Sequence, residues 1–236
     1  TAEGDSVRMS YTVPSSLVAV GNGNLRSVKT IKDKTTYEWF VSNPINNYNI
    51  SVQIGNYVAV QDTFVKDNQT HFMNHYVLDY NKELASNFFP QSKEVIRFYE
   101  KYFGDYQWYE DGYKLIEVPY LGMEHQSAVT YGNGFSMYNG VRSKSWPMYG
   151  VIDPLIIHET GHEWFGNSVT ASDPTHIWIH EGLQVYSESI YFEDKFKSYE
   201  VGVHYLNSIK NRIVNEIPIV GNENENHWAL HGDTYM

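Results

Sequence analysis

The stretch DPLIIHETGHEWFGN, which begins at Asp153, constrains the fold of this chain more than any other part of the sequence. The Asp side chain can accept hydrogen bonds from the first free backbone amides of a helix, and the Pro after it has the backbone angle of a first helical residue. At the other end, Gly166 and Asn167 tolerate the left-handed conformation in which helices stop. These signals predict a helix of about three turns.

The chemistry of that helix is carried by His158, Glu159 and His162. Residues four apart lie one above the other on a helix, so the two imidazoles share a face. Two imidazoles placed in this way can bind one Zn²⁺, and Glu159 can reach a water held by that metal. Two further histidine pairs have the same spacing without the glutamate: His71/His75 and His176/His180. We interpret the first of these pairs as packed or solvated, because it lies in an aromatic, strand-like run.

The chain contains no cysteine, so a third metal ligand must be His, Asp or Glu. Glu181 follows His162 with eighteen residues between them. It lies in a second helical pattern, whose common face holds Glu181, Val185, Glu188 and Phe192. A hydrolytic zinc site has three protein ligands and one open position, whereas a structural site is closed by four. Glu188 could orient a ligating histidine by a hydrogen bond, and a surface carboxylate is the alternative.

These motifs resemble those of a known family. The pattern H-E-x-x-H, eighteen residues and then Glu is similar to that of the gluzincin metallopeptidases, and EWFGNSVT and W-x-x-E-G resemble the aminopeptidase N family, which includes leukotriene-processing aminopeptidase/epoxide hydrolases. Upstream, PYLGMEHQSA at residues 119–128 resembles the family's G-x-M-E-N motif, which thermolysin-like endopeptidases lack. The resemblance implies an α+β fold: the end of an N-terminal β-sheet domain, followed by a thermolysin-like zinc metallopeptidase catalytic domain.

The resemblance also implies which residues bind substrate. Glu124 would hold the free α-ammonium group of a peptide, which restricts cleavage to the first peptide bond. Gly122 and Met123 would bring an edge of backbone against the substrate, and glycine suits this place because it has no side chain to block a close approach. Leu121 and His125 stand where the family has glycine and asparagine, so the shape of the first specificity pocket stays open.

The last residues of the chain, HGDTYM, hold a further candidate. The family supplies a tyrosine, in the pattern Y-x-K-G, that donates a hydrogen bond to the oxyanion formed in the reaction. Tyr235 would be the first half of that pattern. The chain has twenty tyrosines, and a structural role for Tyr235 is the alternative.

With the chemistry of the family, these residues predict a zinc-dependent aminopeptidase. One Zn²⁺ per chain would be held by His158, His162 and Glu181, with a position open for water. Glu159 would accept the proton of that water and deliver it to the leaving amine. Two other functions remain open: a catalytically impaired scaffold of the same fold that binds peptides, and an epoxide or lipid hydrolase that uses the same metal and tyrosine.

The composition limits the classes of partner that this chain is expected to bind. The chain has 236 residues, of which 42% are hydrophobic and 16% aromatic, enough for a globular core. Its net charge of −11, with no basic run, argues against a nucleic-acid partner. No apolar run approaches the roughly eighteen residues of a membrane-spanning helix. The expected partners are peptides with a free N-terminus.

The order of patterns along the chain predicts two domains. Residues 1–62 have the alternation and turn residues of strands and are predicted to be the C-terminal part of an N-terminal β-domain. Residues 63–236 are predicted to form an incomplete thermolysin-like catalytic domain. We expect this chain to be a central fragment, without the N- and C-terminal domains of a parent protein.

The middle of the chain contributes two further elements. Residues 71–80 have the pattern of a strand. Residues 90–106 have a helical pattern, for which Ser92 could supply the cap and Gly104 the end. The aromatic face of this helix is predicted to pack in the core: Ile96, Tyr99 and Phe103.

Overall fold

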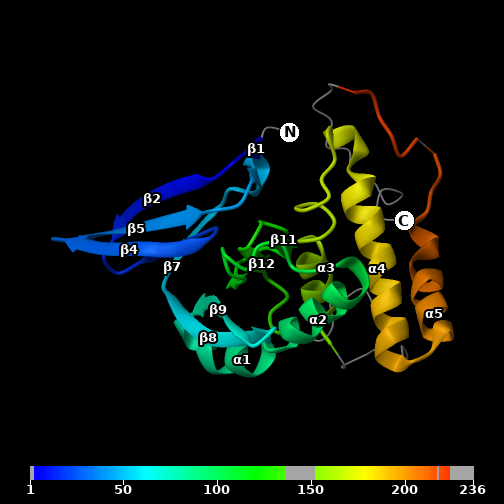
Figure 1. The fold of residues 1–236 in the computed structure, drawn as a ribbon, viewed down its shortest axis with the longest axis horizontal. Coiled ribbons are helices and arrows are strands. Elements are labelled where there is room, and N and C mark those ends of the chain that lie inside the picture. The colour runs from blue at the N-terminus through cyan, green and yellow to red at the C-terminus, as the bar shows by residue number, and fades with distance from the viewer. Residues whose placement is uncertain (1–2, 137–151, 217, 224–236) are drawn as a thin grey trace.

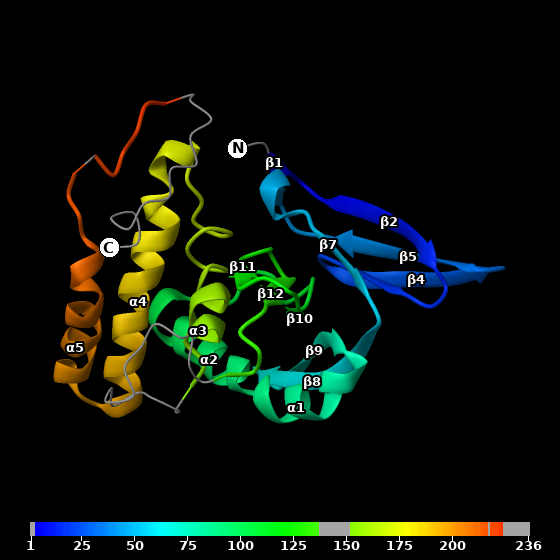
Figure 2. The same ribbon diagram turned by 180° about the vertical axis from the view of Figure 1, so that it is seen from behind.

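The computed structural model describes residues 3–136, 152–216 and 218–223, and strands and helices both contribute to its fold. Figures 1 and 2 show a strand-rich N-terminal part at one end of the molecule, helices at the other end, and a second sheet between them. The α+β class expected from the sequence is therefore confirmed.

Small antiparallel sheets form the N-terminal part. Its strands are β1 (Glu3–Gly4), β2 (Val7–Pro14), β3 (Val18–Gly21), β4 (Asn24–Ile31), β5 (Lys34–Val41), β6 (Ile45–Asn46) and β7 (Val52–Gly55). The largest sheet has the order β2-β5-β4, while β1 pairs with β6 and β3 with β7. Alternate residues of β2, such as Met9 and Val13, are buried, as the two-residue period of a strand requires. Trp39 packs in the same core, and its indole N–H donates to the carbonyl of Ala19.

A mixed sheet of order β11-β12-β10-β9-β8 follows. Its strands are β8 (Tyr57–Lys66), β9 (Gln69–Leu78), β10 (Leu115–Glu117), β11 (Gly122–Met123) and β12 (Val129–Tyr131). The strand predicted at residues 71–80 is confirmed, since β9 covers most of that range. β8 and β9 form an antiparallel hairpin whose turn residues, Asp67 and Asn68, both have positive φ. Residue 62 lies inside β8, and the division into domains there stays a prediction.

The helices are α1 (Lys82–Phe88), α2 (Gln91–Phe103), α3 (Pro154–Gly161), α4 (Trp178–Phe196) and α5 (Tyr199–Ile209). Short 3₁₀ turns lie at η1 (Asn47–Asn49), η2 (Asp79–Asn81), η3 (Pro174–His176) and η4 (Lys210–Arg212). α3 packs against α2, α4 and the strands β11 and β12, and α5 packs on the far side of α4 (Figures 1 and 2). α3 therefore lies at the centre of the helical part of the molecule.

α2 matches its predicted helix except at the first turn. Ile96 and Tyr99 are buried in the core, and Gly104 ends the helix with a φ of 94°. The predicted cap is wrong: Ser92 already lies inside the helix, and its hydroxyl donates to the carbonyl of Phe89 at 2.7 Å. The residue before the helix is Pro90, which makes no side-chain cap. A serine in the first turn has its hydroxyl directed back at the preceding carbonyls, so it cannot act as the cap.

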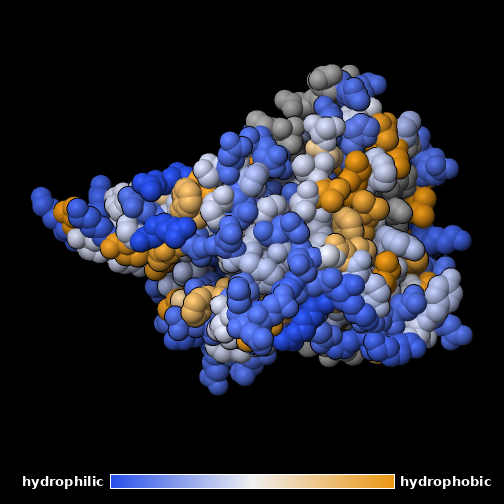
Figure 3. All heavy atoms as spheres, viewed as in Figure 1, coloured by the Kyte–Doolittle hydropathy of each residue, from blue (hydrophilic) through white to orange (hydrophobic). Residues whose placement is uncertain are grey.

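Hydrophobic side chains gather over α4 and α5 on the face shown in Figure 3. An apolar groove there is lined by Val185, Tyr186, Leu206, Ile209 and Ile213. Within the described residues, no helix combines the length and the apolar content that a membrane span requires.

Candidate metal centre

The helix that carries the sequence HETGH begins as predicted. The side chain of Asp153 accepts a hydrogen bond from the backbone N of Leu155 at 2.8 Å, and Pro154 is the first helical residue. The hydroxyl of Tyr131 donates to the other carboxylate oxygen of Asp153 at 2.7 Å, which ties the cap to β12. All residues of α3 except His158 are buried, so packing on every side fixes the helix in place.

α3 ends at Gly161, earlier than the three turns predicted. Beyond it, the amide of Trp164 bonds to the carbonyl of Gly161, and the amide of Asn167 to the carbonyl of His162. Tighter and wider turns therefore replace the regular helical ladder, because the chain reverses at Gly166, whose φ is 132°. His162 caps the helix and still shares a face with His158.

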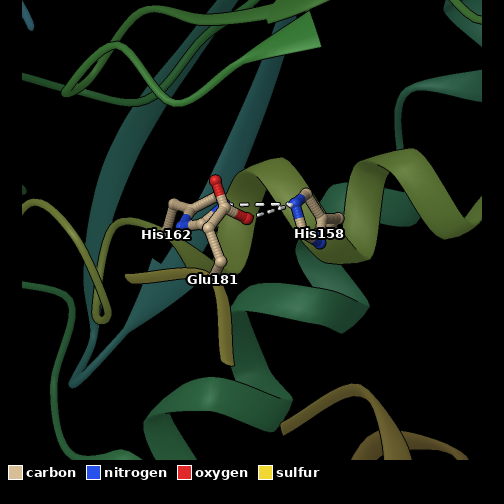
Figure 4. Close-up of side chains that lie close together, drawn as sticks. All are labelled: His158, His162 and Glu181. Carbon is tan, nitrogen blue, oxygen red and sulfur yellow. Dashed lines mark hydrogen bonds and ion pairs between the residues drawn. The ribbon is translucent and has the colours of Figure 1, made fainter. Parts of the chain in front are cut away.

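His158, His162 and Glu181 converge on one point (Figure 4). The Nε2 atoms of the two histidines are 3.2 Å apart. Oε2 of Glu181 lies 3.4 Å from Nε2 of His158 and 3.6 Å from Nε2 of His162. The two histidines come from α3 and its end, while α4 supplies the glutamate. The structure thus brings together the three residues that the sequence predicts as ligands.

These three atoms fit a tetrahedral zinc site. Zn–N and Zn–O bonds of about 2.0–2.2 Å give a tetrahedron with edges of about 3.3–3.6 Å. The separations of 3.2, 3.4 and 3.6 Å are close to those edges. Oε2 of Glu181 is buried and accepts no hydrogen bond from the described residues, as suits an atom that binds a cation. Two imidazoles and a carboxylate are also a donor set of zinc hydrolases.

The charges in this cluster favour a cation. Burial lowers the pKa of His162, but the carboxylate of Glu181 outweighs burial and raises that pKa to about 9. Burial raises the pKa of Glu181, but the two imidazoles, His162 above all, outweigh it and hold the pKa below its usual range. A carboxylate that stays ionised while buried supplies the negative charge that a divalent cation needs.

Two acceptors orient the imidazoles. Oε1 of Glu188 lies 2.7 Å from Nδ1 of His158, and the carbonyl of Phe165 lies 2.8 Å from Nδ1 of His162. A carbonyl and a carboxylate only accept, so each Nδ1 carries a proton, and each Nε2 can bind a metal once it has lost its own proton. Glu188 thus makes the hydrogen bond to a candidate histidine ligand that its place in the sequence suggested. Tyr205 of α5 donates to Glu188 and had no signal in the sequence, because only the packing of α5 on α4 brings it there.

Two further carboxylates, Glu124 and Glu159, lie in the same buried cluster. Their oxygens and a ring nitrogen of His162 all lie within 4.8 Å of one another. Burial raises the pKa of Glu159 to about 7, so this carboxyl group can exchange a proton near neutral pH. A Cβ on Gly122 would lie 2.8 Å from Oε1 of Glu159, so a larger residue there would require one of the two to shift. The close approach of this backbone to a substrate stays a prediction.

The segment that carries Glu124 leaves β11 beside α3. Gly122 and Met123 pair with Tyr131 and Thr130 of β12, and this short strand ends just before Glu124. Glu124 is buried, with 6% of its surface exposed. Glu124 is therefore a buried carboxylate beside the candidate metal ligands, and its role in binding an ammonium group stays a prediction.

Other predicted residues lie elsewhere. The packing expected for His71 and His75 is confirmed: His75 is buried and accepts a backbone hydrogen bond, and the ring of His71 lies 4.1 Å from that of Tyr109. His180 also accepts from a backbone amide, at 2.8 Å, and it joins no metal-binding group of the described residues. Tyr235 lies outside the described residues.

Known proteins share this sequence pattern. Residues 88–223 match the profile of the Peptidase family M1 domain. Aminopeptidase M1-D of Oryza sativa subsp. japonica is 22% identical over 204 residues, which cover 85% of this chain and 23% of the relative. Endoplasmic reticulum aminopeptidase 2 of Homo sapiens is 30% identical over 123 residues, which cover 49% of this chain and 12% of the relative. The chain spans less than a quarter of the length of these curated relatives.

Solved structures share the fold. A two-domain M1 zinc metallopeptidase bound to L-tryptophan superposes with a TM-score of 0.76 at 17% identity, covering 98% of this chain and 49% of that chain. An M1 zinc metallopeptidase from Deinococcus radiodurans has a TM-score of 0.71 at 18% identity, covering 90% and 45%. The resemblance to the aminopeptidase N family is thus confirmed. Because the family profile matches more than half of its residues, this chain belongs to the peptidase M1 family.

Proposed function

We propose that this chain holds the catalytic centre of a zinc-dependent aminopeptidase, which hydrolyses the first peptide bond of peptides with a free N-terminus. The observation that carries the proposal is the buried cluster in which Glu124 and Glu159 lie beside His162. A three-ligand metal site alone would suit many hydrolases. A second buried carboxylate beside the candidate base adds what an exopeptidase needs, a fixed negative charge for the ammonium group of the substrate.

One Zn²⁺ per chain would be held by His158, His162 and Glu181. When bound, the ion would polarise the scissile carbonyl and lower the pKa of water towards about 7. Glu188 and the carbonyl of Phe165 keep both Nε2 atoms turned toward the place of the ion. The ligands are therefore arranged before the ion arrives, which favours binding.

Glu159 is the proposed general base and then general acid. Its carboxylate takes a proton from the attacking water and later gives it to the nitrogen of the leaving amine. A pKa raised by burial to about 7 suits both halves of that cycle. Tyr235 is proposed to donate a hydrogen bond to the oxyanion that forms on the substrate.

Glu124 is the proposed binding group for the substrate's ammonium. Burial strengthens the attraction, because opposite charges interact more strongly in a medium of low dielectric constant. Gly122 and Met123 belong to β11, which lies at the edge of the mixed sheet, so their outer backbone groups can pair with an extended peptide. Together these contacts would place the first carbonyl of the peptide at the metal ligands.

All described residues of this proposed centre lie in the part predicted as the catalytic domain, residues 63–236. Residues 1–62 are proposed to be the C-terminal part of a β-domain. Residues 1–62 are joined directly to the rest of the molecule by hydrogen bonds. Asn22 donates to the carbonyl of Gln126, and Asn49 donates to Asn167, which follows α3.

Two measurements test the proposal. Elemental analysis of chain purified without chelator should find about one zinc per chain, and Glu181→Ala should lose it. Alanine p-nitroanilide should be cleaved, and its N-acetyl analogue should not, because only the first offers an ammonium group. Cleavage of an epoxide without cleavage of the anilide would instead support an epoxide hydrolase. Peptide binding without any hydrolysis would support the scaffold.

A further inference from the structure

A buried polar interface joins the N-terminal part to the catalytic part. Asn22 follows β3 and Asn49 ends η1, and both are fully buried. Across from them lies the segment from Glu124 to Ala128, which we call the Glu124 segment. Most buried amide groups are hydrogen-bonded, and the side-chain amides of Asn22 and Asn49 each donate a bond across the interface.

Asn167, which follows α3 in the chain, lies at the centre of this interface. Its Oδ1 accepts from Nδ2 of Asn49 at 2.7 Å. Its Nδ2 donates to the carbonyl of Glu124 at 2.9 Å and to Oε2 of Glu163 at 3.3 Å. With its oxygen facing one donor and its nitrogen facing two acceptors, the amide has one workable orientation. Asn49 is the donor that decides this orientation.

A second set of bonds holds the same segment two residues further on. Nδ2 of Asn22 donates to the carbonyl of Gln126 at 2.7 Å and to the carbonyl of Asn49 at 2.9 Å. Oδ1 of Asn22 accepts from the backbone N of Ser51 at 2.8 Å. Asn49 is therefore fixed through its own backbone, and it transmits that position to Asn167.

We propose that Asn49 is a positioning residue: through Asn167 it sets the place of the Glu124 backbone, and so of the Glu124 carboxylate, relative to the metal ligands. This inference rests on the proposed function of Glu124 in binding an ammonium group. Among the described residues, the side-chain hydrogen bond of Asn49 goes to Asn167 and to none of the candidate ligands or the proposed base. Its loss should therefore weaken recognition of the amine and leave the metal site intact. Misplacement of a binding group by about 1 Å can reduce its effect by about 10²-fold.

The sharpest variant is Asn49→Asp, which keeps the shape and removes the donor. A carboxylate at position 49 would face Oδ1 of Asn167, so the Asn167 amide must turn over to donate to it. Its oxygen would then face the carbonyl of Glu124, and that contact would become repulsive. Asn49→Ala removes the donor without adding a charge, and it provides the same test if Asn49→Asp does not fold.

Asn46 offers a matched control. It is also buried, it belongs to β6 in the same region, and its Nδ2 also donates across the interface, to Oγ1 of Thr170 at 3.4 Å. Among the described residues, the hydrogen bonds of Thr170 lead to Asn46 and His180 and not to the Glu124 segment. Asn46→Ala and Asn46→Asp should therefore disturb the interface without moving Glu124.

The readout is the preference for an amine, measured by calorimetry on the zinc-loaded chain. The two probes are alanine hydroxamate and propanehydroxamate, which bind a metal alike and differ only in the ammonium group. In the wild type we expect alanine hydroxamate to bind more tightly. Asn49→Asp and Asn49→Ala should reduce the ratio of the two affinities about tenfold, with propanehydroxamate binding changed by less than about twofold. The Asn46 variants should keep the ratio.

Three results would overturn the inference. A wild-type ratio that survives in both Asn49 variants would mean that Asn49 does not position Glu124. An equal loss of affinity for both probes would mean a structural role only. A wild-type chain that binds neither probe, or binds both equally, would overturn the proposed function and this inference with it. The first two results would leave the proposed function standing.

Discussion

The metal ligands and the Glu124 segment lie side by side, but the chain positions them in opposite ways. His158 and His162 are one helical turn apart, and the side chain of Asp153 caps the start of their helix, α3. The Glu124 segment is held by Asn167, 43 residues along the chain, and by Asn22, 104 residues away. The proposed metal ligands therefore depend mainly on helix geometry, while Glu124, the carboxylate proposed to bind the amine, depends on how two parts of the molecule meet.

This difference predicts that the two functions can be separated by mutation. A change in the helices should alter metal binding and leave amine preference unchanged. A change in the long-range contacts should do the reverse. Glu159 is the exception, because it belongs to α3 and also lies against Gly122 of β11.

The largest effect is expected for Glu159→Gln. The amide cannot accept the proton of water, so kcat/KM for alanine p-nitroanilide should fall by about 10³-fold or more. Zinc content should stay near one per chain, because Glu159 is not one of the three ligands. Glu200→Gln, which changes an exposed carboxylate of α5, serves as the control and should leave kcat/KM unchanged. Retained turnover in Glu159→Gln would refute its assignment as the base.

The next largest effect is expected for Glu124→Gln, which keeps the size of the side chain and removes its charge. We expect kcat/KM to fall by about 10²-fold for the anilide with a free amine, since a buried charge pair is lost. Zinc content and the affinity for a metal-binding probe without an amine should not change. If the variant loses zinc as well, the two regions are not separable as proposed.

A smaller effect is expected for Glu188→Gln, on the helix side. The hydrogen bond to Nδ1 of His158 is weakened, and loss of such an outer partner lowers metal affinity by about 10- to 100-fold. Competition with a chelator measures that affinity. Glu193→Gln, in the same helix, changes a carboxylate that contacts neither histidine and should not alter it. The ratio of affinities for the two hydroxamates should stay the same in both variants.

What the sequence predicts follows the same division. The cap at Asp153, the shared face of His158 and His162, and the buried face of Glu181 and Glu188 are all local signals with a fixed period, and the structure contains them. These positions are readable since helix and strand geometry alone place them.

The rest depends on tertiary contacts. The bond from Tyr205 to Glu188 and the bond from Asn49 to Asn167 join elements that the sequence cannot place next to each other. The bond from Asn167 to the carbonyl of Glu124 is of the same kind, because it joins residues 43 apart in the chain. Ser92 shows a different kind of error. Serine favours the cap position of helices, so a cap was predicted there, but the helix begins before Ser92.

The smallest predicted effect concerns His75, which bonds to the first residue of β10, a strand that precedes the Glu124 segment in the chain. Its Nδ1 accepts from the backbone N of Leu115 in β10 at 2.9 Å. Burial lowers the pKa of His75 to about 3, with Asp62 opposing this and two lysines, Lys93 and Lys114, adding to it. Between the unfolded pKa of about 6.5 and this value, the unfolded chain binds more protons than the folded one. The stability contributed by neutral His75 is therefore complete above pH 6.5 and is lost as the pH falls towards 3.

This direction of the change in stability with pH can be tested by comparing variants, without measuring absolute stabilities. His75→Gln should be less stable than the wild type at pH 7.5, because the buried ring is lost. The difference in the free energy of unfolding should shrink by about 1–2 kcal/mol at pH 5, because only the wild type must keep a histidine neutral. Denaturant titrations at both pH values measure this difference, with His71→Gln, on the same strand and partly exposed, as the control. A difference that stays constant with pH would mean that the long-range bond from β9 to β10 does not depend on the protonation of His75.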